Sequence, residues 1–188
     1  MRLKLIIFIL LVFSLPAAAL HGAKTISHKG FPPILDYLNK DNINLVVVDL
    51  DSALKAEPVR PMEKQMAQVI AQLQAGKIKL IGLTSRSPAQ AGPTQNQLRS
   101  LGIHLSPTAL VSKSSTVGKF PGVAYVEGIL YTGSQTDAGQ ALGTWLNQLN
   151  FIPQVLLYVD DSLERIQQVH EAVKKLPGIE FISIHYQE

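Results

Sequence analysis

The sequence of 188 residues contains no cysteine. A disulfide framework, a thiolate zinc site and a cysteine nucleophile are therefore excluded, so aspartate, serine, histidine or a bound metal must carry any chemistry. Charged residues are also scarce, at 16% of the chain, and the formal net charge is only +3. Because nucleic-acid-binding proteins usually present a clustered basic face, this composition argues against a nucleic-acid partner.

No apolar run is long enough to cross a bilayer as a helix. The run from Leu5 to Leu15 spans eleven residues, whereas a transmembrane helix needs roughly twenty. It follows two basic residues and precedes the alanines at 17–19, which is the pattern of a secretory signal peptide. We predict cleavage after Ala19 and a periplasmic or secreted protein without a stable membrane span. An uncleaved membrane anchor is the alternative.

Beyond residues 1–19, the chain divides into a polar lead-in over 20–43 and one domain over 44–188, which is long enough to bury a full core. The spacing of Ile34, Tyr37 and Leu38 predicts a short helix in the lead-in.

Strands and helices alternate in the predicted domain. Short apolar runs rich in β-branched residues predict strands buried on both faces of a parallel sheet. These strands are predicted over 44–51, 78–83, 155–159 and 179–184. Helical spacing of apolar residues predicts helices over 62–75, 90–101, 138–149 and 162–175. Glu127-Gly128 predicts a β-hairpin turn. The sequence therefore predicts an α/β fold, a three-layer α/β/α sandwich with a mainly parallel, five-stranded, Rossmann-like sheet.

Polar residues follow three of the predicted strands. Asp49 and Asp51 follow the first, Thr84 and Ser85 the second, and Asp160 and Asp161 the strand that begins at Val155. The carboxyl ends of parallel strands meet at one edge of a sheet, so these side chains should converge there. Carboxylates brought so close repel one another unless a hard divalent cation lies between them, and Mg²⁺ fits best because it leaves positions for water and a phosphate oxygen.

The segments 46–52, 80–86 and 156–161 resemble the first, second and fourth signature motifs of the haloacid dehalogenase (HAD)-like superfamily. The segment order resembles most a branch of secreted bacterial proteins that form a domain of unknown function. The resemblance implies a HAD-like sheet with a minimal cap and a central Asp49 strand. It also implies a Mg²⁺-dependent phosphatase that acts on a phosphorylated small molecule or an exposed phosphoester.

The resemblance also implies a role for each site residue. Asp49 would be the nucleophile and a metal ligand, and Asp51 the general acid/base and a further ligand through its backbone carbonyl. Asp160 and Asp161 would complete the metal site. Thr84, with Ser85 beside it, would bind the phosphoryl group. Each aspartate taken alone is equally well explained as a helix or turn cap.

One departure weakens the catalytic interpretation. The third motif supplies a lysine or arginine at the start of the helix before the fourth motif, and Ala138 stands there in this sequence. Loss of that cation should raise the energy of a phosphoryl-transfer transition state. Lys113 and Lys119 are the candidates for a substitute. The alternative function is a catalytically impaired binding or interaction protein of the same fold.

Overall fold

The computed structural model describes residues 23–29, 37, 42–55 and 61–187. The predicted signal peptide and its cleavage point lie outside these residues, as does most of the predicted helix around Tyr37. Within the described residues, no helix combines the length and apolar character that a membrane crossing requires.

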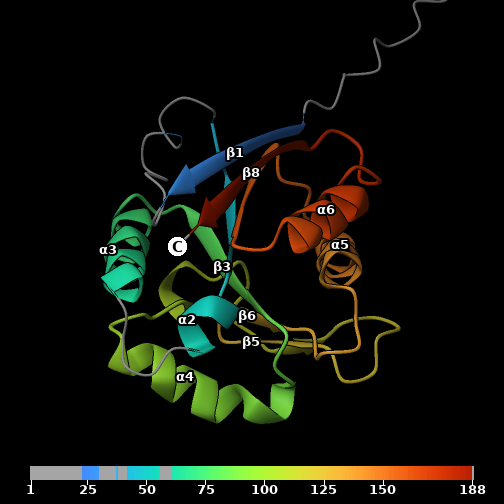
Figure 1. The fold of residues 1–188 in the computed structure, drawn as a ribbon. Helices are drawn as coiled ribbons and strands as arrows, with labels where there is room; N and C mark the ends of the chain where they lie inside the picture. Colours follow the sequence, from blue (N-terminus) through green and yellow to red (C-terminus); the bar gives the residue numbers. More distant parts are fainter. Residues whose placement is uncertain (1–22, 30–36, 38–41, 56–60, 188) are drawn as a thin grey trace, which may run out of the picture.

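An eight-stranded mixed sheet forms the centre of the described chain, in the order β1-β8-β7-β2-β3-β6-β5-β4 (Figure 1). Neighbouring strands from β1 to β6 in this order are parallel, and β5 and β4 continue the sheet by antiparallel pairing. The strands are β1 (Ala23–Lys29), β2 (Leu45–Asp49), β3 (Lys79–Thr84), β4 (Ser115–Thr116), β5 (Ala124–Val126), β6 (Ile129–Tyr131), β7 (Val155–Asp160) and β8 (Glu180–Gln187).

The α/β class is confirmed, whereas the predicted number of five strands is wrong. β1 lies in the segment predicted to be a polar lead-in, and it pairs in parallel with β8 at the edge of the sheet. An edge strand has only one neighbour, so it does not need the continuous apolar run by which buried strands are recognised. The two-residue β4 is too short to leave a sequence pattern.

The predicted hairpin is present between β5 and β6. Its two central residues, Glu127 and Gly128, have φ angles of 47° and 89°. Positive φ at both positions is the requirement of a type I′ turn, whose twist matches that of the strands. The hairpin extends the parallel part of the sheet through the β3–β6 pair.

The side chains of β2 alternate between two separate apolar cores, which places β2 in the middle of three layers. Val46 and Val48 belong to the core under α3 and α4, whereas Leu45 and Val47 belong to the core under α5 and α6. Figure 1 accordingly shows α3 on one side of the sheet and α5 and α6 on the other. The helices are α2 (Asp51–Lys55), α3 (Pro61–Ala75), α4 (Ala91–Ser100), α5 (Ala138–Gln148) and α6 (Leu163–Val173), with the 3₁₀ turns η1 (Pro88–Gln90) and η2 (Ser106–Thr108).

The four long helices begin and end within two residues of their predicted bounds. The short helix α2 is not among the predicted helices. This helix starts at the residue where the chain leaves β2, and it sets the direction of the Asp51 side chain.

Close contact between α5 and α6 depends on a glycine. A Cβ atom added at Gly139 would lie 2.2 Å from the carbonyl oxygen of Gln168, whereas one added at Gly143 would lie 3.7 Å from the Cβ of Ala172.

We predict that Gly139→Ala lowers the free energy of unfolding by about 1–3 kcal/mol, because backbone atoms must move apart. The matched change Gly143→Ala should raise it by up to about 1 kcal/mol through helix propensity. Urea unfolding measures both changes in the free energy of unfolding. Equal changes for the two substitutions would contradict the dependence of the helix contact on Gly139.

Candidate active site

The four aspartates singled out in the sequence meet at the carboxyl edge of the sheet. Asp49 is the last residue of β2, Asp160 is the last residue of the neighbouring strand β7, and Asp161 follows it. Asp51 begins α2. The predicted convergence is confirmed, because one side chain, that of Arg165, contacts all four carboxylates.

The Arg165 guanidinium lies at the centre of this acidic cluster. Its Nη2 atom is 3.1 Å from Oδ2 of Asp49 and 3.1 Å from Oδ1 of Asp161, and its Nη1 atom is 3.3 Å from Oδ2 of Asp51. With Asp160 it forms a forked pair, Nε and Nη2 each lying 3.0 Å from a carboxylate oxygen. Such a planar fork suits a guanidinium and not an ammonium group.

Sequence reasoning missed Arg165. It lies in the first turn of α6, whose N-cap Ser162 accepts a hydrogen bond from the Arg165 backbone N–H. This cap fixes the start of the helix directly after the strand end, so the arginine side chain lies beside Asp160. The available signal was its spacing of four residues from Asp161, which is close enough along the chain for the two side chains to pair.

Burial opposes ionisation of the two central carboxyls. Asp49 is 1% exposed and Asp160 is fully buried. Burial raises the pKa of Asp49 well above its usual value, the negative charge of Asp160 adds to this effect, and the Arg165 charge acts against it. Burial also raises the pKa of Asp160, against its hydrogen bonds from Arg165. Asp160 further accepts hydrogen bonds from the Tyr158 hydroxyl and from the Ser162 N–H.

Three of the carboxylates are arranged to share a metal ion. Oxygen atoms of Asp49, Asp160 and Asp161 all lie within 4.8 Å of one another. The Ser52 hydroxyl donates to Asp161 at 2.8 Å, which holds that more exposed side chain toward the others. A set of carboxylate oxygens is the donor type that hard divalent cations take. The cluster can therefore hold a metal ion.

Asp51 differs from the other three aspartates. Its carboxylate accepts a hydrogen bond of 2.6 Å from the Thr84 hydroxyl and is 3.1 Å through each of its oxygens from the Ser85 N–H. It therefore lies toward β3 and outside the group of three that can share an ion. The hydroxyl of Thr84, the residue expected to bind a phosphoryl group, donates to Asp51 in this structure.

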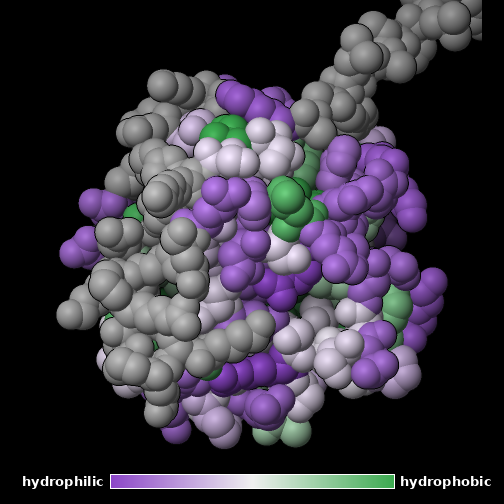
Figure 2. Space-filling view, in the orientation of Figure 1, coloured by the Kyte–Doolittle hydropathy of each residue, from purple (hydrophilic) through white to green (hydrophobic). Residues whose placement is uncertain are grey.

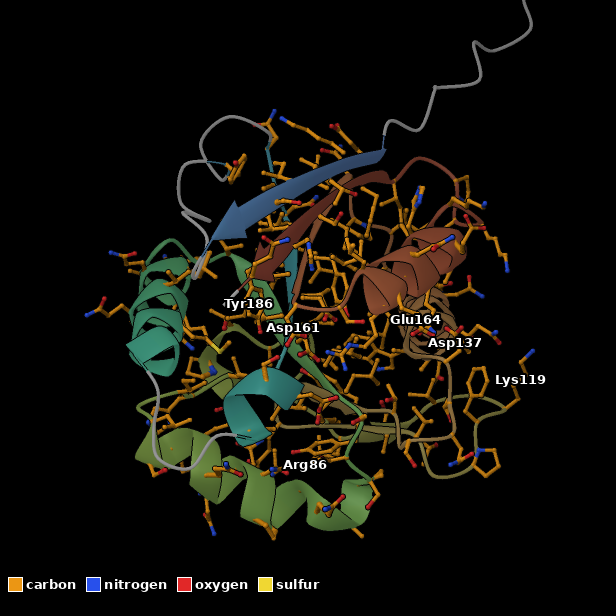
Figure 3. The ribbon with its side chains drawn as sticks, in the orientation of Figure 1. Arg86, Lys119, Asp137, Asp161, Glu164 and Tyr186 are labelled. Carbon is orange, nitrogen blue, oxygen red and sulfur yellow. The ribbon has the colours of Figure 1, made fainter. Side chains whose placement is uncertain are left out.

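A cavity of about 350 Å³ opens above these residues. Its floor includes Asp49, Asp51 and Arg165, and its far wall is the loop over 132–137 that leads into α5. Ala138, where the third motif would place a lysine, also lines this cavity. Figure 3 shows Asp161 near the middle of the view, and Figure 2 shows hydrophilic residues gathered around that place.

Lys113 and Lys119 do not line this cavity. Lys113 is exposed in the loop before β4. The Nζ atom of Lys119 lies 5.8 Å from the ring centroid of Phe120, beside a different hollow, and Figure 3 shows Lys119 far from Asp161. The geometry therefore offers Arg165, and neither lysine, as the cation next to Asp49.

We predict that Asp49→Asn raises the free energy of unfolding of the metal-free protein at pH 7, by an amount on the order of 1 kcal/mol. The raised pKa of Asp49 means that the folded protein binds this proton more tightly than the unfolded chain. The stability that this group contributes is complete below the unfolded pKa of about 4 and is lost as the pH rises through the folded value. The advantage of the variant should therefore shrink toward pH 4.

Urea unfolding in the presence of EDTA measures this difference. A variant that is less stable than the natural protein at pH 7 would contradict it, because the ion pair between Asp49 and Arg165 would then outweigh the cost of burying the carboxylate.

Comparison with known proteins places the chain in a family without assigning it a reaction. No curated protein matches it. A family profile matches residues 33–188, which include every residue of the acidic cluster and of the cavity wall. This match bears out the resemblance to a group of unknown function, and it does not connect the chain to the haloacid dehalogenase-like superfamily. On this match the chain belongs to the family described as "Protein of unknown function (DUF2608)".

Proposed function

We propose that this protein is a Mg²⁺-dependent phosphomonoester hydrolase that acts through an aspartyl-phosphate on Asp49. The observation that carries the proposal is the position of the Asp49 carboxylate. It lies on the floor of an open cavity, beside a fixed cation and within a group of oxygens that can hold a metal ion. The motif resemblance supports the same reaction. The leader-like segment over 1–19 supports action in the periplasm or outside the cell.

In the proposed reaction, an oxygen of Asp49 attacks the phosphorus atom of the ester. The new bond from Asp49 to phosphorus forms as the bond to the leaving alcohol breaks, and Asp51 gives that alcohol its proton. Asp51 then takes a proton from water, whose oxygen attacks the same phosphorus and releases inorganic phosphate and the free carboxylate. Thr84 and the Ser85 N–H hold Asp51 in place for both proton transfers.

Arg165 supplies the positive charge that position 138 lacks. It contacts Asp49 directly, so it can neutralise the attacking carboxylate and the phosphoryl oxygens beside it. The side chain comes from the helix that follows β7, whereas the third-motif lysine would come from the helix that precedes it.

Asp49, Asp160 and Asp161 would hold Mg²⁺, which fits their oxygen donors. When bound, the ion would withdraw charge from the phosphoryl group. Arg165 also contacts a carboxylate oxygen of each of these three residues in this structure.

A second candidate function follows from the same contacts. Arg165 pairs with all four carboxylates at once, so the cluster is held together without a metal ion. A binding protein that has kept the fold and lost the reaction would have this arrangement. Such a protein would not turn over phosphoesters at any Mg²⁺ concentration.

We predict that the purified protein hydrolyses phenyl phosphate with Mg²⁺ and that Asp49→Asn lowers kcat by about 10⁴-fold or more, because the nucleophile is lost. The matched control Glu180→Gln changes an exposed acid at the start of β8 in the same way and should leave kcat unchanged. Release of inorganic phosphate measures the rate. Equal rates for the natural protein and the Asp49→Asn variant would favour the binding protein.

We predict that Arg165→Ala lowers kcat/KM by about 10²–10³-fold, the usual cost of removing one transition-state donor. Adding Ala138→Lys to that variant should restore part of the loss, because position 138 lines the same cavity. The control Arg99→Ala removes an exposed arginine from α4. If the protein with both Arg165→Ala and Ala138→Lys has a kcat/KM no higher than that of Arg165→Ala alone, positions 138 and 165 do not supply the same charge.

A further inference from the structure

We infer that the leaving group of the substrate is a neutral, polyhydroxylated alcohol, so that the protein acts on monophosphates of sugars or polyols. This inference rests on the proposed hydrolysis and names its substrate class. It is drawn from the residues that line the cavity wall outside the acidic cluster.

Uncharged hydrogen-bonding groups make up most of that wall. The loop between β6 and α5 contributes Ser134, Gln135 and Thr136, and α6 contributes Gln168. The Thr136 hydroxyl has no hydrogen-bond partner among the described residues, and the Gln168 amide has only a long contact of 3.4 Å to Glu164. Hydroxyls and amides can each donate and accept, which matches the hydroxyl groups of a polyol.

Charge at the mouth of the cavity disfavours an anionic leaving group. Asp137 lines the cavity beside this loop, and its carboxylate is held by the Gln140 N–H at 2.8 Å. Glu164 and Glu171 line the adjoining groove together with Asp137 and Lys175, and Glu171 is paired with Lys174. Figure 3 shows Asp137 and Glu164 close together on this side. A second negative charge on the substrate would meet these acids.

The described lining of the cavity also offers no ring on which an aromatic leaving group could stack. None of the described residues that line it has an aromatic ring, and Leu83 and Ala138 are its apolar side chains. Nucleobases and aryl groups are usually bound by stacking on such rings. Its volume of about 350 Å³ lies near the lower end of the range for ligand sites, which suits a single sugar.

The test compares kcat/KM of the purified protein with Mg²⁺ for glucose 6-phosphate, 3-phosphoglycerate, ethanolamine phosphate and phenyl phosphate. The sugar phosphate should exceed both 3-phosphoglycerate and ethanolamine phosphate by at least tenfold. Phenyl phosphate reports the phosphoryl-transfer step separately, because phenolate is a better leaving group than an alkoxide and depends less on contacts with the cavity wall.

Variants then test the cavity wall itself. Thr136→Val and Gln168→Leu should each lower kcat/KM for glucose 6-phosphate at least tenfold more than for phenyl phosphate, because each change removes a hydrogen bond that only the hydroxylated leaving group can make. The matched control Gln167→Leu changes the neighbouring residue of α6, which does not line this cavity. It should leave the ratio of the two substrates unchanged.

The outcomes separate the inference from the reaction on which it rests. Turnover of phenyl phosphate with a preference for 3-phosphoglycerate or ethanolamine phosphate would overturn the substrate class alone. Equal losses on both substrates in the Thr136 and Gln168 variants would do the same. No turnover of any of the four esters would overturn the proposed hydrolysis and, with it, this inference.

Discussion

The arrangement of this site depends on one interaction, the pairing of a single guanidinium with four carboxylates at the end of two adjacent strands. Two of those carboxyls, Asp49 and Asp160, are almost completely buried, and burial alone would favour their neutral forms. Arg165 supplies a charge that opposes this effect and hydrogen bonds that orient all four groups. This pairing buries charged groups, which costs solvation free energy. The site is therefore best explained as one retained for chemistry or binding and not for stability.

The fold was predictable to the extent that its strands are buried on both faces. β2 and β7 are buried along their whole length and are apolar up to the aspartate that ends each strand, so a hydrophobic run identifies each from sequence alone. β1 has the sequence AKTISHK and a single neighbouring strand, so no such run exists. The short helix α2 was missed for a related reason, because five residues hold too little of a helical repeat to be recognised.

The candidate site was predictable where it depends on strand ends and not where it depends on side-chain direction. Position on parallel strands fixes where Asp49 and Asp160 lie, and their convergence follows from topology. Whether Asp51 turns toward the metal-capable group or toward Thr84 depends on the local path of α2, which the residue spacing does not contain. The cation that pairs with the carboxylates was expected before β7, at position 138, which holds Ala138. It lies after β7, at Arg165.

The parallel pairing of β1 with β8 constrains the order in which this molecule can assemble. Its register pairs Ala23 with Phe181 and Lys29 with Gln187. Formation of this strand pair therefore closes a loop that contains every other strand of the sheet. Contacts of such high sequence separation form late, because a large loss of chain entropy precedes them. A polypeptide emerging in order from a ribosome or a translocation pore therefore cannot complete this border of the sheet until residues beyond 180 are free. Until then, the backbone groups of β1 that pair with β8 are unpaired. A chaperone or an aggregating neighbour would bind β1 during this time.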